Sequence, residues 1–280
     1  MFVVAGTSGH TGAVVAETLL AKGEKVRVLA RDASKAAKWK EKGAEIAIAD
    51  IGDAAALGKA LAGAKGFYTL LPPILTSNSV IADQAKRIDA MAKAIQASKT
   101  PHVVFLSSAG ADLPSGTGPI VSLHQAEKAL SGVTALTPIR AAYFMENWGG
   151  SLGALKDGVL PTFIHADAQI PMVATRDIGT TAANALVAGP KGTIELAGPR
   201  EYSAKDVAAI LSKMVGREIK VQQGPEEAIA PTFKSFGMSD DMARLYHEMI
   251  HAFNAGQVRW QGAPVRGTTP IESVLKSMLG

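Results

Sequence analysis

The sequence predicts an α/β fold, a Rossmann-type doubly wound parallel sheet with a smaller, helix-rich C-terminal substrate lobe. Three observations predict this fold. Short apolar stretches alternate with helical patterns through the first half of the chain. A glycine triad, Gly6, Gly9 and Gly12, lies between the first apolar stretch and the first helical pattern. After Arg140 glycine and proline interrupt the alternation. Strands separated by helix-length segments are typical of right-handed βαβ units, with helices on both faces of a parallel sheet.

The first half contains six expected strands and five expected helices. The strands are short runs rich in β-branched and aromatic residues, at 2–5, 26–30, 45–49, 66–71, 102–107 and 134–139. The helices have apolar residues three and four positions apart, at 11–21, 33–42, 54–61, 79–97 and 122–130.

The second half is less regular. Glycine and proline punctuate residues 149–171, and a strand at 193–196 is expected to rejoin the sheet. Ser203 is a favourable N-cap for a helix at 204–215, and a short strand at 218–221 precedes helices at 226–236 and 240–255. We therefore expect a Rossmann domain at 1–140, completed by 172–197. The substrate lobe is expected to comprise 141–171 and 198–280.

Composition narrows the class of protein. The 280 residues are 47% hydrophobic and 19% charged, enough to bury a large core, and the 29 Lys and Arg are scattered, which gives no nucleic-acid-binding arm. The absence of cysteine excludes disulfides, thiol catalysis and cysteine-bound metals. The chain passes from Met1 directly into an apolar stretch, and no apolar run reaches the ~18 residues of a membrane span. We expect a cytoplasmic protein that does not bind membranes.

The glycine triad belongs to the segment Gly6-Thr7-Ser8-Gly9-His10-Thr11-Gly12. In a strand–loop–helix context the first glycine allows a tight turn, the second lets the backbone approach a pyrophosphate, and the third lets the helix pack on the strand. The helix N-terminus then favours the negative phosphates. All seven residues are therefore expected to bind a dinucleotide.

The end of the second strand bears on the choice of dinucleotide. An acidic residue there would hold the ribose 2′-hydroxyl of NAD, whereas an arginine would hold the 2′-phosphate of NADP. Arg31 is the first residue beyond the strand, and Asp32 is a favourable N-cap for the next helix. The sequence therefore favours NADPH over NADH. Lys35 could add a second charge toward the 2′-phosphate, or could lie on a solvated helix face.

Further segments resemble the NmrA-like atypical short-chain dehydrogenases/reductases, and the resemblance spans about residues 1–220. The segments, in order, are the glycine loop, Val28-Leu29-Ala30-Arg31-Asp32 with Lys35, Asp50, Leu70-Leu71-Pro72-Pro73, Phe105-Leu106-Ser107-Ser108-Ala109, Pro138-Ile139-Arg140, Phe144-Met145-Glu146-Asn147, Arg176-Asp177-Ile178-Gly179 and Leu196-Ala197-Gly198-Pro199. The chain is most similar to the branch of NADPH-dependent quinone oxidoreductases. The resemblance implies Asp50 and Ile51 near the adenine, Thr69, Leu70, Leu71 and Pro72 along the ribose and nicotinamide, and Ser107 close to the nicotinamide.

One departure from ordinary short-chain dehydrogenases concerns catalysis. Those enzymes use Tyr-x-x-x-Lys, and the matching segment here is His124-Gln125-Ala126-Glu127-Lys128. Lys128 keeps the lysine position and is a candidate ribose ligand, with a solvated lysine as the less favoured alternative. His124 could act as an acid, or could be a surface histidine near the pocket mouth. Tyr143 is the other phenol candidate. The missing tyrosine disfavours alcohol oxidation, which needs a positioned base, more than hydride delivery to an electron-poor acceptor.

Aromatic residues gather where the substrate lobe is expected to begin. Tyr143, Phe144 and Trp148 could form a flat apolar slot for an aromatic acceptor, and at least half of this cluster is expected to be core packing. Asn147 could contact substrate or orient the loop.

The segment His247-Glu248-Met249-Ile250-His251 matches the zinc-protease motif H-E-x-x-H, with Glu272 as a conceivable third ligand. Only three positions of this motif are fixed, and the N-terminal half predicts a nucleotide fold. We expect no metal site here.

The sequence therefore favours an NADPH-dependent oxidoreductase that acts on a quinone or another small electron-poor aromatic molecule. Two alternatives stay open: a non-catalytic NADP(H)-sensing regulatory protein, and a biosynthetic ketone or imine reductase with His124 as acid. A homodimer is possible, since parallel sheets covered by helices often dimerise, but no segment identifies the surface.

Overall fold

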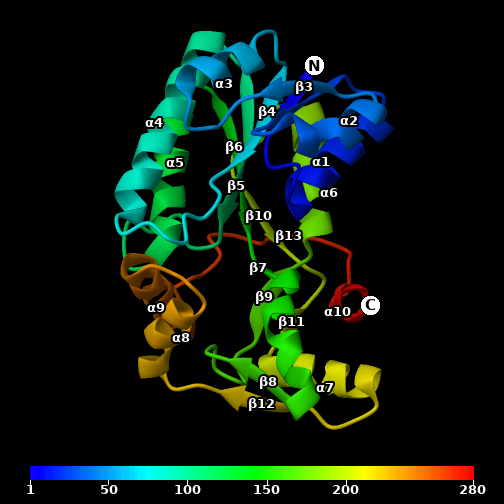
Figure 1. Cartoon of the computed structure of the whole chain (residues 1–280), viewed down its shortest axis with the longest axis vertical. Coiled ribbons are helices and arrows are strands. Elements are labelled where there is room, and N and C mark those ends of the chain that lie inside the picture. The colour runs from blue at the N-terminus through cyan, green and yellow to red at the C-terminus, as the bar shows by residue number, and fades with distance from the viewer.

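The computed structural model describes residues 1–280 apart from the side chain of Lys35, and it confirms the expected α/β fold. Eight strands form one sheet, and every neighbouring pair in it is parallel. Figure 1 shows this sheet in the upper half of the molecule. In spatial order the strands are β13 (Val265–Arg266), β10 (Ile194–Ala197), β6 (Ala135–Ala141), β5 (His102–Ser108), β4 (Gly66–Leu70), β1 (Phe2–Val4), β2 (Val26–Ala30) and β3 (Glu45–Ile48).

Helices cover both faces of the sheet, as its two apolar faces require. One face packs against α1 (His10–Ala21), the 3₁₀ turn η1 (Ala33–Ala36) with α2 (Ala37–Glu41), and α6 (Thr175–Ala188). The other face packs against α3 (Ala54–Leu61), α4 (Val80–Ser98), and α5 (Val121–Ser131), which follows the 3₁₀ turn η2 (Gly118–Ile120). Gly179 brings α6 against α1, because a Cβ there would lie 2.5 Å from the Cβ of Val14.

The lower half of the molecule in Figure 1 has its own apolar core, built from elements of distant sequence. Its strands form two small sheets, β11 (Glu201–Tyr202), β9 (Ile170–Val173) and β7 (Tyr143–Phe144) in one, and β12 (Lys220–Gln223) with β8 (Val159–Thr162) in the other. Its helical elements are η3 (Met145–Asp157), α7 (Ala204–Val215), η4 (Glu226–Ala228), α8 (Ile229–Ser235), α9 (Asp240–Asn254) and α10 (Ile271–Leu279).

Several elements of the second half differ from the sequence-based expectation. The pattern analysis did not predict α6 or α10, and it left 265–266 in the substrate lobe, although β13 pairs with β10 in the large sheet. The two-residue β13 is too short to show an alternating pattern. The small residues of α6 allow close packing against α1.

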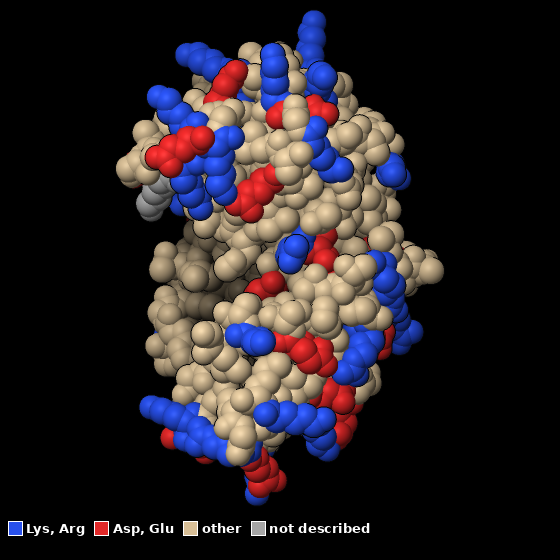
Figure 2. All heavy atoms as spheres, turned by 90° about the vertical axis from the view of Figure 1, so that its right-hand side faces the viewer, with Lys and Arg blue, Asp and Glu red and all other residues tan. Residues whose placement is uncertain are grey.

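The order of the strands positions a crevice at their carboxyl ends. From β1 the chain moves outward to β2 and β3, and then returns to add β4 on the other side of β1. Loops after neighbouring strands diverge at such a switch point, where nucleotides bind in open α/β sheets. Figure 2 shows a hollow at mid-height, on the left edge of that view, between the upper and lower halves. Lys and Arg side chains gather above it, and its visible floor is mostly uncharged.

Among the described residues, no helix combines the length and the apolar character needed to cross a bilayer.

Candidate cofactor and acceptor site

The glycine loop connects β1 to α1, and each of its three glycines meets a different steric demand. Gly6 has φ +70°, and a Cβ there would lie 2.5 Å from Cδ2 of Leu70. A Cβ on Gly12 would lie 2.5 Å from the carbonyl carbon and oxygen of Gly6 and 2.6 Å from the oxygen of Ala5. A Cβ on Gly9 would have only the Gly6 oxygen nearby, at 3.5 Å. The loop therefore leaves open space beside Gly9, where a pyrophosphate would approach.

The start of α1 is suited to an anion. Its N-cap residue Gly9 has no side chain to accept from the first backbone N–H groups, so these groups and the helix dipole can act on a phosphate. The Tyr68 hydroxyl donates to Oγ1 of Thr11 at 3.0 Å and fixes the first turn. Burial raises the pKa of Tyr68, which stays a neutral donor. Ser8 and His10 are exposed beside the loop, whereas Thr7 is buried. These residues fit a bound dinucleotide.

The end of β2 separates the roles of Arg31 and Asp32. Asp32 accepts from the backbone N–H and the hydroxyl of Ser34, both at 2.9 Å, and caps η1 as the sequence predicted. Arg31 is exposed at the strand end and makes no side-chain hydrogen bond or ion pair with the described residues. Lys35, the other residue expected at a 2′-phosphate, has a side chain outside the described part of the structure.

The residues expected along the adenine and ribose lie at the carboxyl ends of β3 and β4. Asp50 accepts from the N–H of Gly52 at 2.8 Å and shapes the turn that contains Ile51. Thr69 is fully buried, with Oγ1 directed to the sulfur of Met91, so only its backbone is available to a ligand. Leu70 contacts the glycine loop.

The loop after β4 is held from α4. Leu71 is partly buried and Pro72 is exposed. Nε2 of Gln84 donates to the carbonyl of Pro72 at 2.9 Å, and this loop continues the same edge of the sheet. The residues expected along the ribose and nicotinamide therefore lie on a segment that Gln84 of α4 holds in place.

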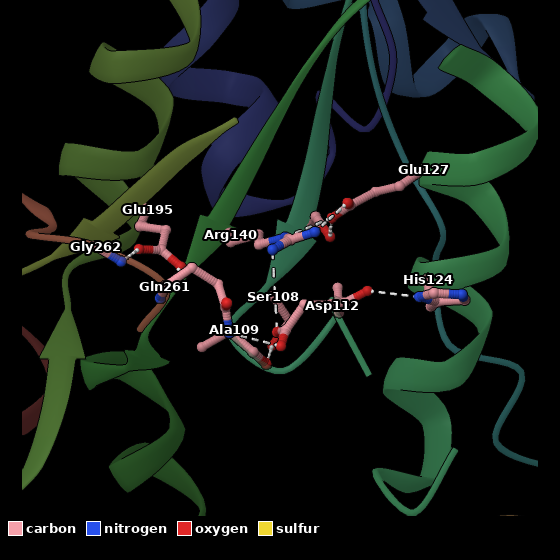
Figure 3. Close-up of polar contacts among 11 residues, drawn as sticks. Ser108, Ala109, Asp112, His124, Glu127, Arg140, Glu195, Gln261 and Gly262 are labelled. Carbon is pink, nitrogen blue, oxygen red and sulfur yellow. Dashed lines mark hydrogen bonds and ion pairs between the residues drawn. The ribbon is translucent and has the colours of Figure 1, made fainter. Parts of the chain in front are cut away.

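A polar network lies at the carboxyl ends of β5 and β6 (Figure 3). Ser107 donates to Oε1 of Glu127 at 2.6 Å, and Arg140 makes two hydrogen bonds to the same carboxylate, at 3.1 and 2.7 Å. Only 14% of the Arg140 side chain and 12% of the Glu127 side chain are exposed. The hydrogen bonds to Glu127 raise the pKa of Arg140, so the guanidinium stays charged. Ser107, expected near the nicotinamide, is thus held by its hydroxyl in this network.

The network continues away from α5. Asp112 lies 4.0 Å from Arg140 and accepts from the amide of Gln261 at 2.8 Å. Glu195 on β10 accepts from the backbone N–H groups of Gln261 and Gly262 at 2.8 and 2.9 Å, and so holds the segment after α9 on the sheet edge (Figure 3). The sequence analysis assigned no role to Glu127, Asp112 or Glu195. The one available signal was that Glu127 precedes the expected Lys128 on a helix facing the sheet.

His124 and Lys128 lie on α5 but have different surroundings. Nδ1 of His124 is 2.9 Å from the carbonyl oxygen of Ala111, and this oxygen can only accept, so Nδ1 carries a proton. The second ring nitrogen points away from Arg140 in Figure 3. In the neutral ring that nitrogen is an acceptor, and only the imidazolium could donate from it. Lys128 is exposed.

The aromatic residues of the segment that starts at Tyr143 have different surroundings. Trp148 is 3% exposed, and its Nε1 contacts the sulfur of Met172 at 3.4 Å, so it belongs to the core of the lower half. Phe144 is partly buried against the core of the sheet. Tyr143 is partly buried, with its ring centre 6.2 Å from that of Trp148. Burial raises the pKa of Tyr143 to about 12, partly offset by a hydrogen bond with the Asn147 side chain.

Glu146 is the charged residue within this segment, and it binds the start of α6. Its carboxylate accepts from the backbone N–H of Thr175 at 2.9 Å and from the Thr175 hydroxyl at 2.6 Å. It therefore stabilises the start of α6 and fixes the loop in which Tyr143 and Asn147 lie.

The zinc-protease-like motif falls on α9, with its two histidines on one face. His247 Nε2 and His251 Nδ1 lie 3.0 and 2.8 Å from the same oxygen of Glu226, and Glu248 lies 3.5 Å from Arg244. Glu272 lies 3.9 Å from Arg200. Throughout the described residues, no three histidine, aspartate or glutamate side chains form a group that could hold a metal ion.

Comparison with known proteins places these features in a family. The model of the NmrA-like family matches residues 1–265. Quinone oxidoreductase 2 of Escherichia coli is 29% identical over 254 residues, covering 88% of this chain and 85% of that protein. An NAD(P)H azoreductase of Xenophilus azovorans is 24% identical over 253 residues, covering 89% of this chain and 86% of that protein. The structure of an Escherichia coli NADPH-dependent quinone oxidoreductase in complex with NADPH aligns over 100% of both chains, with a TM-score of 0.84 and 25% identity. The chain belongs to the NmrA-like family.

Proposed function

We propose that the protein is an NADPH-dependent reductase that delivers hydride to a quinone or another electron-poor aromatic acceptor. The observation that carries the proposal is the open backbone cradle at Gly9, followed at the next strand end by the exposed Arg31. The similarity to an NADPH-dependent quinone oxidoreductase and to an azoreductase supports both the cofactor and the class of acceptor.

The residues of this chain bind and orient the reactants. The chemistry supplied by bound NADPH is hydride transfer from its nicotinamide ring. The N-terminus of α1 would hold the pyrophosphate, and Arg31 would hold the 2′-phosphate through charge-assisted hydrogen bonds. Asp50 and Ile51 would lie beside the adenine, and the loop of Leu70, Leu71 and Pro72 would lie beside the ribose and nicotinamide. Such a site accelerates the reaction largely by positioning.

Protons reach the reduced acceptor after or during hydride transfer. His124 lies at the start of α5 and can donate from its second ring nitrogen as an imidazolium, and water can replace it. Ser107 holds the end of β5 in place through Glu127 and Arg140. Lys128 is assigned to the ribose. Tyr143 contacts the acceptor, with Asn147 orienting it and with Phe144 and Trp148 supporting the loop.

NADPH oxidation tests this proposal against the two alternatives. Purified protein is mixed with NADPH and a panel of quinones, azo and triphenylmethane dyes, ketones and imines, and the nicotinamide absorbance is followed. We expect quinones or dyes to be reduced at least tenfold faster, as kcat/KM, than ketones and imines. Faster reduction of ketones or imines would favour the biosynthetic reductase. Tight NADPH binding without turnover of any acceptor would favour the sensor and overturn the proposal.

A further inference from the structure

Arg87 on α4 lies between two loops that belong to the proposed cofactor site. Its aliphatic stem lies against the turn after β3, because a Cβ on Gly52 would lie 3.5 Å from Cγ of Arg87. Its Nη1 atom is 3.4 Å from the carbonyl oxygen of Pro72, in the loop after β4. The turn is the one expected beside the adenine, and the loop is the one expected beside the ribose and nicotinamide. One side chain therefore contacts both loops.

The fold uses little of the Arg87 guanidinium. The bond to Pro72 is long, and the group makes no other hydrogen bond and no ion pair with the described residues. Gln84 holds the same carbonyl at 2.9 Å, so the loop is fixed without Arg87. Asp83, one turn earlier on the helix, forms its ion pair with Lys86 at 2.8 Å. Because a guanidinium carries several N–H donors, most of those on Arg87 are free to bind a ligand.

Asp50 offers an acceptor beside the same turn. Its Oδ1 atom accepts from the N–H of Gly52, whereas its Oδ2 atom has no hydrogen-bond partner among the described residues. A Cβ on Gly52 would lie 3.2 Å from Oδ1 of Asp50, and the stem of Arg87 is near the same point. An acceptor and a set of donors therefore lie close together. Adenine presents the matching pattern, an amino group that donates next to a ring nitrogen that accepts.

The phosphates of the cofactor are expected on the other side of the sheet. The pyrophosphate is assigned to the start of α1, and the 2′-phosphate to Arg31, which directly precedes η1 and α2. These helical elements pack on one face of the sheet, whereas α3 and α4 pack on the opposite face. Figure 1 shows α3 and α4 on the same side of the sheet. Arg87 therefore faces the base of a bound dinucleotide more directly than its phosphates.

We propose that Arg87 is a cofactor-binding residue whose guanidinium contacts the adenine base of NADPH beside Asp50. The inference rests on the proposed reductase function and adds a residue that the sequence analysis did not assign to the site. A guanidinium suits this contact because it donates hydrogen bonds and also packs against aromatic faces. NADPH and NADH share the adenine, so Arg87 contributes affinity for both, whereas Arg31 distinguishes them by the 2′-phosphate.

The test compares Arg87→Met with the wild type in calorimetric titrations with NADPH, NADH and adenosine 2′,5′-bisphosphate. Methionine keeps an apolar side chain against Gly52 and removes the guanidinium. All three ligands contain adenine, so we expect each to bind about tenfold more weakly to the variant. Lys86→Met is the matched control, since Lys86 is the neighbouring cation on α4 and its side chain is 78% exposed. We expect the control to change the three dissociation constants less than twofold.

Each other pattern of binding would overturn the inference. Unchanged affinity of Arg87→Met for all three ligands would show that the guanidinium does not contact the cofactor. Weaker binding of NADPH and the bisphosphate, but not of NADH, would assign Arg87 to the 2′-phosphate. Weaker binding of the two dinucleotides, but not of the bisphosphate, would show that Arg87 acts only through the loop at Pro72. These three outcomes reject the adenine contact and leave the reductase standing, whereas a wild-type protein that binds none of the ligands would reject both proposals.

Discussion

The cofactor half and the acceptor half of this molecule differ in the groups that they offer to a ligand, which are backbone groups at the glycine loop of the first and side chains in the second. At the glycine loop, recognition would depend on the backbone: Gly9 leaves space, Gly12 allows α1 to lie close to β1, and the uncapped N–H groups of α1 would face the phosphates of the proposed cofactor. At the acceptor end, the candidate contacts are the side chains of Tyr143 and Asn147, which are joined by a hydrogen bond. The first arrangement fits one invariant group of the cofactor, whereas the second can change with the acceptor while the fold stays constant.

The difference also shows in how each half is held rigid. The cofactor loop is fixed by close backbone approach and by the buried hydrogen bond from Tyr68 to Thr11. The acceptor end is fixed by long-range polar links, which are the Ser107–Glu127–Arg140 network and the hydrogen bond that Asp241 on α9 accepts from the N–H of Val80. Substitutions in the cofactor half should therefore affect folding and NADPH binding together. Substitutions of acceptor-facing side chains should affect turnover with little change in NADPH binding.

The largest expected effect comes from Gly12→Ala. A Cβ 2.5 Å from the Gly6 backbone forces α1 away from β1, and overpacking of this kind costs about 1–3 kcal/mol. We expect a loss of more than 100-fold in NADPH affinity, measured by nicotinamide fluorescence, together with a lower melting temperature. Gly58→Ala is the control, since its Cβ would lie 3.9 Å from Ala94, and it should stabilise α3 by about 0.5–1 kcal/mol with unchanged affinity. Unchanged affinity in Gly12→Ala would remove the loop from the cofactor site.

Raising the pH tests the acceptor half of the molecule through the buried phenol of Tyr143. Tyr143 has a pKa raised from 10.0 to about 12, so the unfolded chain loses this proton first. The free energy of unfolding should therefore be unaffected by this group below pH 10 and fall as pH rises from 10 to about 12, by about 2–3 kcal/mol at 1.36 kcal/mol per unit. Tyr68 and Tyr246 act in the same direction.

The measurement is urea unfolding at a series of pH values in the wild type and in Tyr143→Phe. The variant should show a shallower decline above pH 10 and the wild-type affinity for NADPH. Identical pH profiles in the two proteins would show that the Tyr143 phenol is not buried as the structure places it.

Arg31→Ala tests the choice of cofactor. Hydrogen bonds to a charged group contribute about 1.5–3 kcal/mol, so we expect NADPH to bind about 10- to 100-fold more weakly. NADH lacks the 2′-phosphate, and its affinity should change less than threefold. Titration of both cofactors into the wild type and the variant measures the difference, and equal weakening of both would exclude Arg31 from the 2′-phosphate.

The smallest effect is expected for His124→Ala. Water can deliver the proton in place of the imidazolium, so kcat for quinone reduction should fall less than tenfold. The measurement is steady-state turnover with saturating NADPH, since removal of the ring also removes its hydrogen bond to Ala111. A loss greater than a hundredfold would make His124 an essential acid and would contradict catalysis by positioning.

The cofactor half could be predicted from the sequence because its signals are local. The residues from Gly6 to Gly12 carry the loop within one βαβ unit, and β2 and α3 begin and end where the pattern predicts. Glu127 and Arg140 could not be paired in this way, since nothing in the spacing between α5 and β6 shows which side chains meet across them. The position of α9 depends on the same kind of long-range contact, because hydrogen bonds at Leu75, Ser77 and Val80 hold its N-terminal end. Charge and aromaticity are visible in a sequence, but their partners across the fold are not.

The central claim, that this site transfers a hydride from NADPH to an aromatic acceptor, is tested most directly in a single turnover. Protein loaded with NADPH is mixed in a stopped-flow instrument with excess naphthoquinone, using either ordinary NADPH or NADPH deuterated at the transferred position. The account predicts that the bound cofactor is oxidised and that deuteration slows this step at least twofold. Bound NADPH that persists in the presence of excess naphthoquinone would contradict it.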